Sequence, residues 1–215
     1  MSSNSAAADL RAYGRTRIAS RRMAALVAAL AALALVADAP RDAGDVLLRT
    51  ALAALLALSF RVWDDLADRA FDGARHPDRV LARSTQPGWF WAALAGAAAV
   101  SVGALGAFGG AASLPVYGGL VILLAVVYHG PWRMTRERFI RTQLVLLKYP
   151  AFIAMLGVSG VTSRTALCGA AGYLLISLHE WHDDPALRER YLGGRLAVTF
   201  AVGLIAALSL VAAHD

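Results

Sequence analysis

Residues 45–81 read DVLLRTALAALLALSFRVWDDLADRAFDGARHPDRVL, a long apolar segment followed at once by a run of carboxylates. Asp64, Asp68 and Asp72 are spaced four residues apart, which places them on one face of a helix. Carboxylates at this spacing repel one another, and acids at a membrane edge are costly unless they serve a function. Mg²⁺ takes one or two carboxylates as ligands and completes its shell with waters and substrate phosphate oxygens. The stretch therefore predicts Mg²⁺ and a diphosphate substrate.

The rest of the chain is too apolar for one soluble core. Hydrophobic residues make up 58% of the 215, and the mean hydropathy is +0.54. A membrane span takes roughly 17–25 residues. The sequence thus predicts an all-α, polytopic transmembrane helix bundle, with a basic N-terminal segment at 1–22 and a transmembrane domain at 23–215. We expect residues 2–9 to be disordered. We expect seven spans, near residues 23–38, 45–62, 89–110, 114–130, 143–160, 165–181 and 196–213.

The basic residues indicate the orientation. Most of them precede the first span or lie in alternate loops, including the loops that carry the acids. The positive-inside rule then places the N-terminus and the acidic loops in the cytoplasm, and we expect an integral protein of a bacterial inner membrane. Anionic lipid headgroups account for the net charge of +6 without nucleic acid as a partner. A cleavable secretory signal is the alternative for the first span, because Ala37-Asp38-Ala39 resembles a cleavage site.

A second acidic stretch, LHEWHDDP at residues 178–185, ends the sixth predicted span. Glu180 and Asp184 share a helical face, and Asp183 lies beside them. The span count puts this stretch on the same membrane side as Asp64, so two distant acidic clusters can converge and hold two or more Mg²⁺ ions around a diphosphate. His179 and His182 suggest a transition metal instead, but they do not have the spacing of the His-Glu-x-x-His motif.

Cationic residues near these acids are candidates for binding the diphosphate. Lys148 is the only lysine and falls inside the fifth predicted span. A buried ammonium is a functional-site hypothesis by default, and the alternative is a side chain that snorkels to the interface. Near predicted span ends lie His129 and several tryptophans, which we interpret as interfacial residues without a chemical role: Trp63, Trp89, Trp132 and Trp181. The arginines that we select as candidates for the diphosphate are Arg79, Arg133 and Arg141.

These motifs resemble the UbiA superfamily of intramembrane prenyltransferases over roughly residues 10–213. The family's first signature is Asn-Asp-x-x-Asp-x-x-x-Asp followed by Pro-Asp-Arg-Pro-Leu. This chain has Asp64-Asp65-x-x-Asp68-x-x-x-Asp72 and then Pro77-Asp78-Arg79-Val80-Leu81. The second signature is matched more loosely by Glu180, Asp184, Glu189 and Gly193, with one extra residue before Glu189. The loop from Tyr128 to Arg133 is similar to the family's Tyr-x-x-x-Lys-Arg loop in its Tyr and Arg only.

The resemblance implies Mg²⁺-dependent transfer of a prenyl group from a polyprenyl diphosphate to a lipophilic, often aromatic, acceptor. It implies a UbiA-like fold that lacks the last two of nine helices, and a second copy of the chain could close the cavity. By this resemblance one metal site uses Asp64, Asp65, Asp68 and Asp72, and the other uses Glu180, Asp184 and Asp183. The residues assigned to the substrate are Arg79, Arg133, Lys148, Asp78 and Arg141.

Three other functions stay open at this point. A terpene cyclase of the same family would quench the allylic cation internally rather than transfer it to an acceptor. A transporter would use the acids as a cation path, although its acids should lie near the middle of spans. A chain that has lost activity could serve as an assembly partner.

Overall fold

The structure is a computed structural model that describes residues 6–130, 138–158, 160–183 and 202. Every regular element in these residues is helical, which confirms the predicted all-α class for this part of the chain. Apart from residue 202, the predicted span at 196–213 lies outside the described residues. The elements are α1 Ala6–Tyr13, the π-helical turn η1 Gly14–Ile18, α2 Arg21–Ala37, α3 Ala43–Ala67, α4 Arg69–Arg75, α5 Val80–Arg83, α6 Gly88–Phe108, α7 Ser113–His129, α8 Arg138–Leu146, α9 Lys148–Leu156 and α10 Ser163–Asp183.

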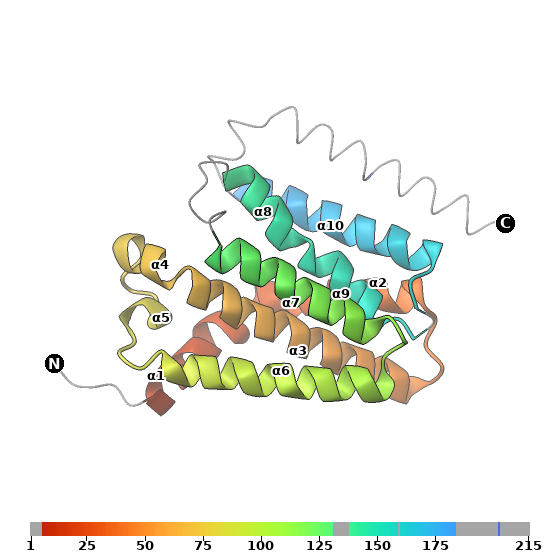
Figure 1. The fold of residues 1–215 in the computed structure, drawn as a ribbon, viewed down its shortest axis with the longest axis horizontal. Coiled ribbons are helices and arrows are strands. Elements are labelled where there is room, and N and C mark those ends of the chain that lie inside the picture. The colour runs from red at the N-terminus through yellow and green to blue at the C-terminus, as the bar shows by residue number, and fades with distance from the viewer. Residues whose placement is uncertain (1–5, 131–137, 159, 184–201, 203–215) are drawn as a thin grey trace.

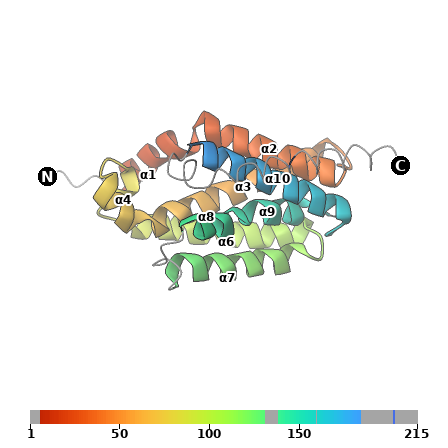
Figure 2. The same ribbon diagram turned by 90° about the horizontal axis from the view of Figure 1, so that it is seen from above.

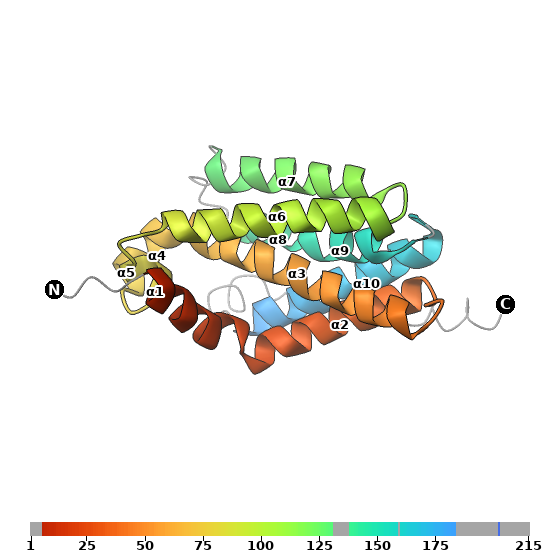
Figure 3. The ribbon, with the colours of Figure 1, turned by 90° about the horizontal axis from the view of Figure 1, so that it is seen from below.

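The long helices run side by side along the longest axis of the molecule (Figure 1). Helices α3 and α9 lie in the middle, with α2 and α10 on one side and α6 and α7 on the other (Figures 2 and 3). Successive pairs α2–α3, α3–α6, α6–α7, α7–α9, α9–α10 and α10–α2 are all in contact, so these helices form a closed ring. Short helices α4 and α5 gather with α1 at one end of α3.

Two of these helices, α3 and α6, are long and apolar enough to cross a membrane. The segment Ala6–Ile18 and helix α2 are bent by 64° relative to each other and would form a third candidate span if counted as one. Five of the seven predicted spans coincide with single helices, and the span predicted at 143–160 is broken at Leu147 into α8 and α9. Large apolar side chains on α6 and α7, such as Phe108 and Ile122, are exposed, as expected for helices that face lipid.

Capping residues set the helix starts. The side chain of Ser20 accepts a hydrogen bond from Met23 N at 3.2 Å, and that of Asp42 accepts one from Asp45 N at 2.8 Å. The N-terminal segment differs from the predicted disorder, because residues 6–9 belong to α1 and Asp9 is buried. Small residues such as Ala34 and Ala53 are fully buried where α2 and α3 meet, which allows these backbones to approach closely.

The predicted ladder of acids does not lie on one straight helix. Helix α3 ends at Ala67 and α4 begins at Arg69, and between them Asp68 has φ −87° and ψ 1°. Backbone hydrogen bonds from Asp68 N to Asp64 O (2.9 Å) and from Asp72 N to Asp68 O (2.8 Å) continue through this turn. The bend nevertheless carries Asp72 away from Asp64. The prediction that these acids share a single helical face is therefore wrong, and they form two groups.

A buried ion cluster lies at the end of the bundle away from α4 and α5. Arg49 is 2% exposed, and its guanidinium donates to both carboxylate oxygens of Asp45 at 2.8 and 2.7 Å and to the Asp38 carbonyl at 2.6 Å. Asp38 Oδ2 also accepts a hydrogen bond from Val158 N at 2.7 Å. The cluster ties together the ends of α2, α3 and α9. It lies about 22 Å from Asp64, because α3 rises roughly 1.5 Å per residue.

Candidate active site

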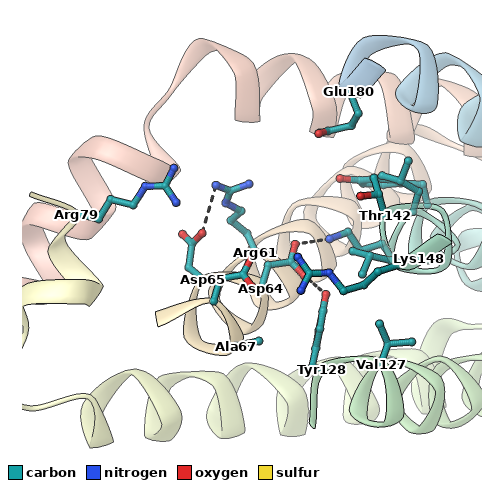
Figure 4. A pocket seen from close by; sticks show the side chains of 15 residues that line it. Arg61, Asp64, Asp65, Ala67, Arg79, Val127, Tyr128, Thr142, Lys148 and Glu180 are labelled. Carbon is teal, nitrogen blue, oxygen red and sulfur yellow. Dashed lines mark hydrogen bonds and ion pairs between the residues drawn. The ribbon is translucent and has the colours of Figure 1, made fainter. Parts of the chain in front are cut away.

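Both acidic segments reach one cavity at the other end of α3, near α4. This cavity, which we call the polar cavity, has a volume of about 240 Å³ and is open at one side. Tyr128 of α7 and Tyr149 of α9 line it together with charged groups of both signs (Figure 4). Its acidic lining residues are Asp64, Asp65, Asp68 and Glu180. Its basic lining residues are Arg61, Arg79, Arg141 and Lys148.

Asp64 is held by two donors from different helices. The Tyr128 hydroxyl donates to Asp64 Oδ1, and the Lys148 ammonium donates to Asp64 Oδ2. Lys148 is the first residue of α9 and is only 4% exposed, so its charge points into the bundle rather than to the interface. A buried ammonium is costly when unpaired, and the carboxylate offsets that cost. The snorkelling alternative for Lys148 is therefore wrong, and its candidacy as a site residue stands.

Asp65 is held by the N-terminal part of the chain. The Tyr13 hydroxyl donates to Asp65 Oδ2 at 2.9 Å, and Arg17 Nε lies 3.6 Å from the same oxygen. Arg61, one helical turn earlier on α3, places a guanidinium nitrogen 3.3 Å from Asp65 Oδ1. Burial and the adjacent Asp65 carboxylate raise the pKa of Tyr13, so its hydroxyl remains a donor. Helix α1 thus covers the acidic segment and stabilises it.

Asp72 and Asp78 belong to a different cavity. Asp72 is 4% exposed, and Arg79 Nη1 donates to its two carboxylate oxygens at 2.6 and 2.7 Å. Together with Tyr13 and Asp65, these side chains line a cavity of about 300 Å³ beneath α1. Asp72 does not line the polar cavity, because the turn at Asp68 redirects α4. Its predicted place beside Asp64 is therefore corrected, and its structural partner is Arg79.

Glu180 brings the second acidic segment to the site. It is exposed at the last turn of α10, and its carboxylate faces the polar cavity from the side opposite α3 (Figure 4). Arg133 and Asp184 lie outside the described residues, and for Asp183 the structure describes only the backbone, at the end of α10. His182 is exposed beyond Glu180. Trp181 is 1% exposed, which overturns its interpretation as an interfacial tryptophan.

A larger cavity continues from the polar one toward the membrane-spanning part. It has a volume of about 650 Å³, lies between α2, α3, α9 and α10, and we call it the long cavity. Five residues line both cavities: Arg61, Asp64, Lys148, Tyr149 and Glu180. The rest of its lining includes the polar residues Thr16, Arg17, Ser20, Arg22 and His179 and apolar ones such as Met23, Leu26, Ala29, Phe152 and Ile176. The combined space thus offers charged groups together with an apolar wall, which suits an amphipathic ligand.

The fit of Mg²⁺ to these residues depends on chemistry and position. Carboxylate oxygens from α3 and, across the polar cavity, from α10 are the hard ligands that Mg²⁺ prefers. Within residues 6–130, 138–158 and 160–183, however, no three His, Cys, Asp or Glu side chains are grouped closely enough to hold an ion. Asp64 instead bonds to Lys148 and Tyr128. The donor atoms are of the type that Mg²⁺ prefers, but binding an ion would require these pairs to rearrange and the carboxylates to come closer together.

Sequence reasoning missed four residues of the site: Tyr13, Arg17, Arg61 and Tyr149. Arg61 could have been found, since a basic residue four positions before Asp65 forms an i,i+4 pair on a helix. Tyr149 follows Lys148 directly, so its place near the site was available once Lys148 had been selected. Tyr13 and Arg17 carry no sequence signal, because their contact with Asp65 depends on how α1 and η1 fold back.

Comparison of the chain with models of protein families, with curated proteins and with solved structures yields no match. In the part of the chain that the structure describes, the fold and site define an all-helical protein with two or three candidate membrane spans and a charged cavity that continues into a larger, partly apolar one.

Proposed function

We propose that this chain is an integral membrane prenyltransferase of the UbiA type that transfers the prenyl group of a polyprenyl diphosphate to a lipophilic acceptor with Mg²⁺. One observation carries the proposal. The carboxylates of both signature segments and a set of cations line the polar end of a space that continues along apolar side chains of α2, α3, α9 and α10. A polyprenyl diphosphate has the same division into a charged head and an apolar tail.

The charge of the polar cavity supports a metal-dependent reaction. Its wall carries four acidic and four basic residues, so formal charges balance before any ligand binds. A diphosphate would add negative charge to a site that already holds four carboxylates. Divalent cations at Asp64, Asp65, Asp68 and Glu180 would compensate that charge and stabilise the departing diphosphate. Outside the described side chains, Asp183 and Asp184 are the further acids that we assign to this metal site.

The cations have separate positions around the proposed diphosphate. Arg61 and Lys148 lie where the polar and long cavities join, and they would contact the phosphate that carries the prenyl chain. Arg79 and Arg141 line the polar cavity but not the long cavity, and they would hold the outer phosphate. Arg133 is assigned to the same role by the resemblance alone.

The apolar wall would protect the reactive cation. Tyr149 lines both cavities, and Phe152 lies one helical turn further on the same helix. Aromatic faces near the junction would stabilise an allylic cation through their π-electrons. A prenyl chain bound along the apolar residues of the long cavity would displace water there, which would limit hydrolysis of the cation. If the allylic cation were quenched within the same prenyl chain rather than by an acceptor, the same arrangement would serve a cyclase.

The proposal is tested by pyrophosphate release in nanodiscs. Full-length protein is mixed with allylic diphosphates of several chain lengths, with Mg²⁺ or with EDTA, and with or without candidate acceptors. We expect release that requires Mg²⁺ and falls at least 100-fold in Asp68→Asn, because that carboxylate lines the polar cavity.

The matched control for this assay is Asp42→Asn. It makes the same chemical change at the opposite end of α3 and keeps an asparagine that can still cap the helix. A cyclic product without any added acceptor would select the cyclase. Absence of turnover with every donor, or equal turnover in both variants, would overturn the proposal.

A further inference from the structure

The segment Ala6–Ile18, which we call the N-terminal strap, lies across one end of the bundle. It begins beside α5 and runs obliquely to the start of α2 (Figure 3). Of residues 6–18, only Asp9 and Tyr13 are buried, and their spacing places them on one helical face. Arg11 and Arg15 are exposed on the outside. The strap therefore presents a narrow inner face to the bundle.

The joint between the strap and α2 is not a continuous α-helix. Residues Gly14–Ile18 form the π-helical turn η1, and such turns are frequent at functional sites. Ala19 then departs from helical geometry with a ψ of 30°, and the Ser20 side chain caps α2 by accepting a hydrogen bond from Met23 N. The strap and α2 are inclined by 64°. Because α2 has its own cap, the strap can move without unwinding that helix.

A cavity lies under the strap where a packed core would otherwise hold it. The cavity beneath α1 has a volume of about 300 Å³, and Tyr13, Thr16 and Arg17 line it from the side of the strap. The Tyr13 ring contacts Phe90 edge-on, with centroids 5.4 Å apart. Segments with few buried contacts open at a low cost in free energy. The polar contacts of the strap with Asp65 are therefore important for its attachment.

The strap and the polar cavity share Asp65. This residue lines both the polar cavity and the cavity beneath α1. Its Oδ2 atom accepts a hydrogen bond from the Tyr13 hydroxyl at 2.9 Å and lies 3.6 Å from Arg17 Nε. Its Oδ1 atom lies 3.3 Å from a guanidinium nitrogen of Arg61. Both carboxylate oxygens are thus engaged, and two of the three groups that engage them belong to the strap.

These contacts oppose metal binding at Asp65. A divalent cation would need a carboxylate oxygen that Tyr13 and Arg17 now contact, and it would repel the Arg17 guanidinium. Arg61 belongs to α3 and would stay near the site, whereas Arg17 belongs to the strap and can leave with it. The Arg17 side chain is already 27% exposed, so solvent can take up its charge.

We propose that the N-terminal strap competes with a divalent cation for Asp65. The strap is docked while Tyr13 and Arg17 hold this carboxylate, and it is released when the cation binds there. The proposal rests on the metal site proposed above and adds how access to that site is regulated. The coupling is reciprocal, because a cation that must displace the strap binds more tightly when the strap is already free. Tyr13 and Arg17 are thus positioning residues for Asp65.

Equilibrium binding of Mn²⁺, followed by the electron paramagnetic resonance signal of the free ion, tests the competition. The full-length protein is used in nanodiscs of zwitterionic lipid, with no diphosphate present. We expect about tenfold tighter binding in the double variant Tyr13→Phe/Arg17→Gln than in wild type, and a smaller gain in each single variant. Arg15→Gln is the matched control, because it makes the same charge change on the exposed side of the strap, and it should leave the affinity nearly unchanged.

Contacts that only stabilise the site would give the opposite result. If Tyr13 and Arg17 merely kept Asp65 in a metal-binding position, the double variant would bind Mn²⁺ more weakly than wild type. Weaker or unchanged binding in that variant would overturn the proposal. Absence of Mn²⁺ binding in wild type and in every variant would overturn it as well.

A distance measurement follows the strap while its own contacts are intact. Nitroxide labels are placed at Arg11→Cys on the strap and Arg83→Cys on α5, both exposed positions, in a Cys168→Ser background. Double electron–electron resonance with diamagnetic Mg²⁺ should give a narrow distribution in EDTA and a broader one, extending to longer distances, at saturating Mg²⁺. The pair Ala28→Cys and Arg83→Cys reports the bundle and should not respond. A distribution from the strap pair that Mg²⁺ leaves unchanged would overturn the proposal.

The strap and the prenyltransferase fail through different results. Mg²⁺-dependent pyrophosphate release, together with an unchanged Mn²⁺ affinity in Tyr13→Phe/Arg17→Gln, would support the enzyme and overturn the strap. Tighter Mn²⁺ binding in that variant and strap release with Mg²⁺, without turnover of any donor, would support the strap and overturn the enzyme.

Discussion

The Lys148–Asp64 pair allows a direct test of how the site is held together. Lys148→Met removes the ammonium while keeping a long apolar side chain, and Asp64→Asn removes the carboxylate charge. The Lys148 side chain is 5% exposed and that of Asp64 is 18% exposed, so each change leaves the other charge largely out of water. Removing one partner of a buried pair costs about 3–5 kcal/mol. We expect about 3 kcal/mol for Lys148→Met, because Asp64 retains the Tyr128 hydroxyl and some contact with solvent.

The measurement is the free energy of unfolding in mixed micelles. Unfolding is monitored by circular dichroism while the mole fraction of the denaturing detergent is increased. The double variant leaves no unpaired charge. We therefore expect its loss in free energy of unfolding to be smaller than the sum of the two single losses by at least about 2 kcal/mol. Arg83→Met is the control, because it removes an exposed positive charge away from the polar cavity. Single losses below about 1 kcal/mol that simply add would refute the pairing.

Three further predictions concern other parts of the structure. Arg49→Met should lower the free energy of unfolding by about 3–5 kcal/mol, because it leaves Asp45 and Asp38 without their buried cation; a loss below about 1 kcal/mol in the same micelle assay would contradict the cluster. Tyr13→Phe should cost about 1 kcal/mol through the lost bond to Asp65, and an unchanged stability would show that α1 is not held there. Ala29→Phe should reduce turnover of the longest allylic diphosphates at least tenfold and spare the shortest, because Ala29 lines the apolar end of the long cavity. Ala28→Phe, exposed on α2 but outside that cavity, should leave turnover unchanged, and an equal effect of both variants would contradict the assignment.

The sequence predicted helices well where apolar runs were long and bounded by polar residues. The segments of α2, α3, α6, α7 and α10 agree with predicted spans to within a few residues, except that α3 continues to Ala67. Apolar length alone could not reveal the break at Leu147. The sequence signal for it is Pro150, which is tolerated in the first turn of α9 but would kink one continuous helix. How many helices cross a membrane stays a prediction beyond the two or three that are long and apolar enough.

The site was predictable where a residue was costly for its surroundings. Lys148 was selected because an ammonium in an apolar segment requires a partner, and the structure supplies Asp64, which is 84 residues away in the chain. The identity of that partner could not be predicted, since it depends on α9 packing beside α3. Helical periodicity failed at Asp72, because one turn at Asp68 changes the direction of the chain. The contact of Tyr13 with Asp65 depends on tertiary packing that local patterns do not encode.

The most direct test of the central claim is where the metal and the diphosphate bind. We would determine the structure of the full-length protein in lipid with Mn²⁺ and a slowly reacting allylic thiodiphosphate, and locate the metal by its anomalous scattering. The account predicts metal density in the polar cavity between α3 and Glu180, diphosphate density beside Lys148, and the prenyl chain along Met23 and Phe152. Metal bound only at Asp72 and Asp78 beneath α1, or a ligand that leaves the polar cavity empty, would contradict it.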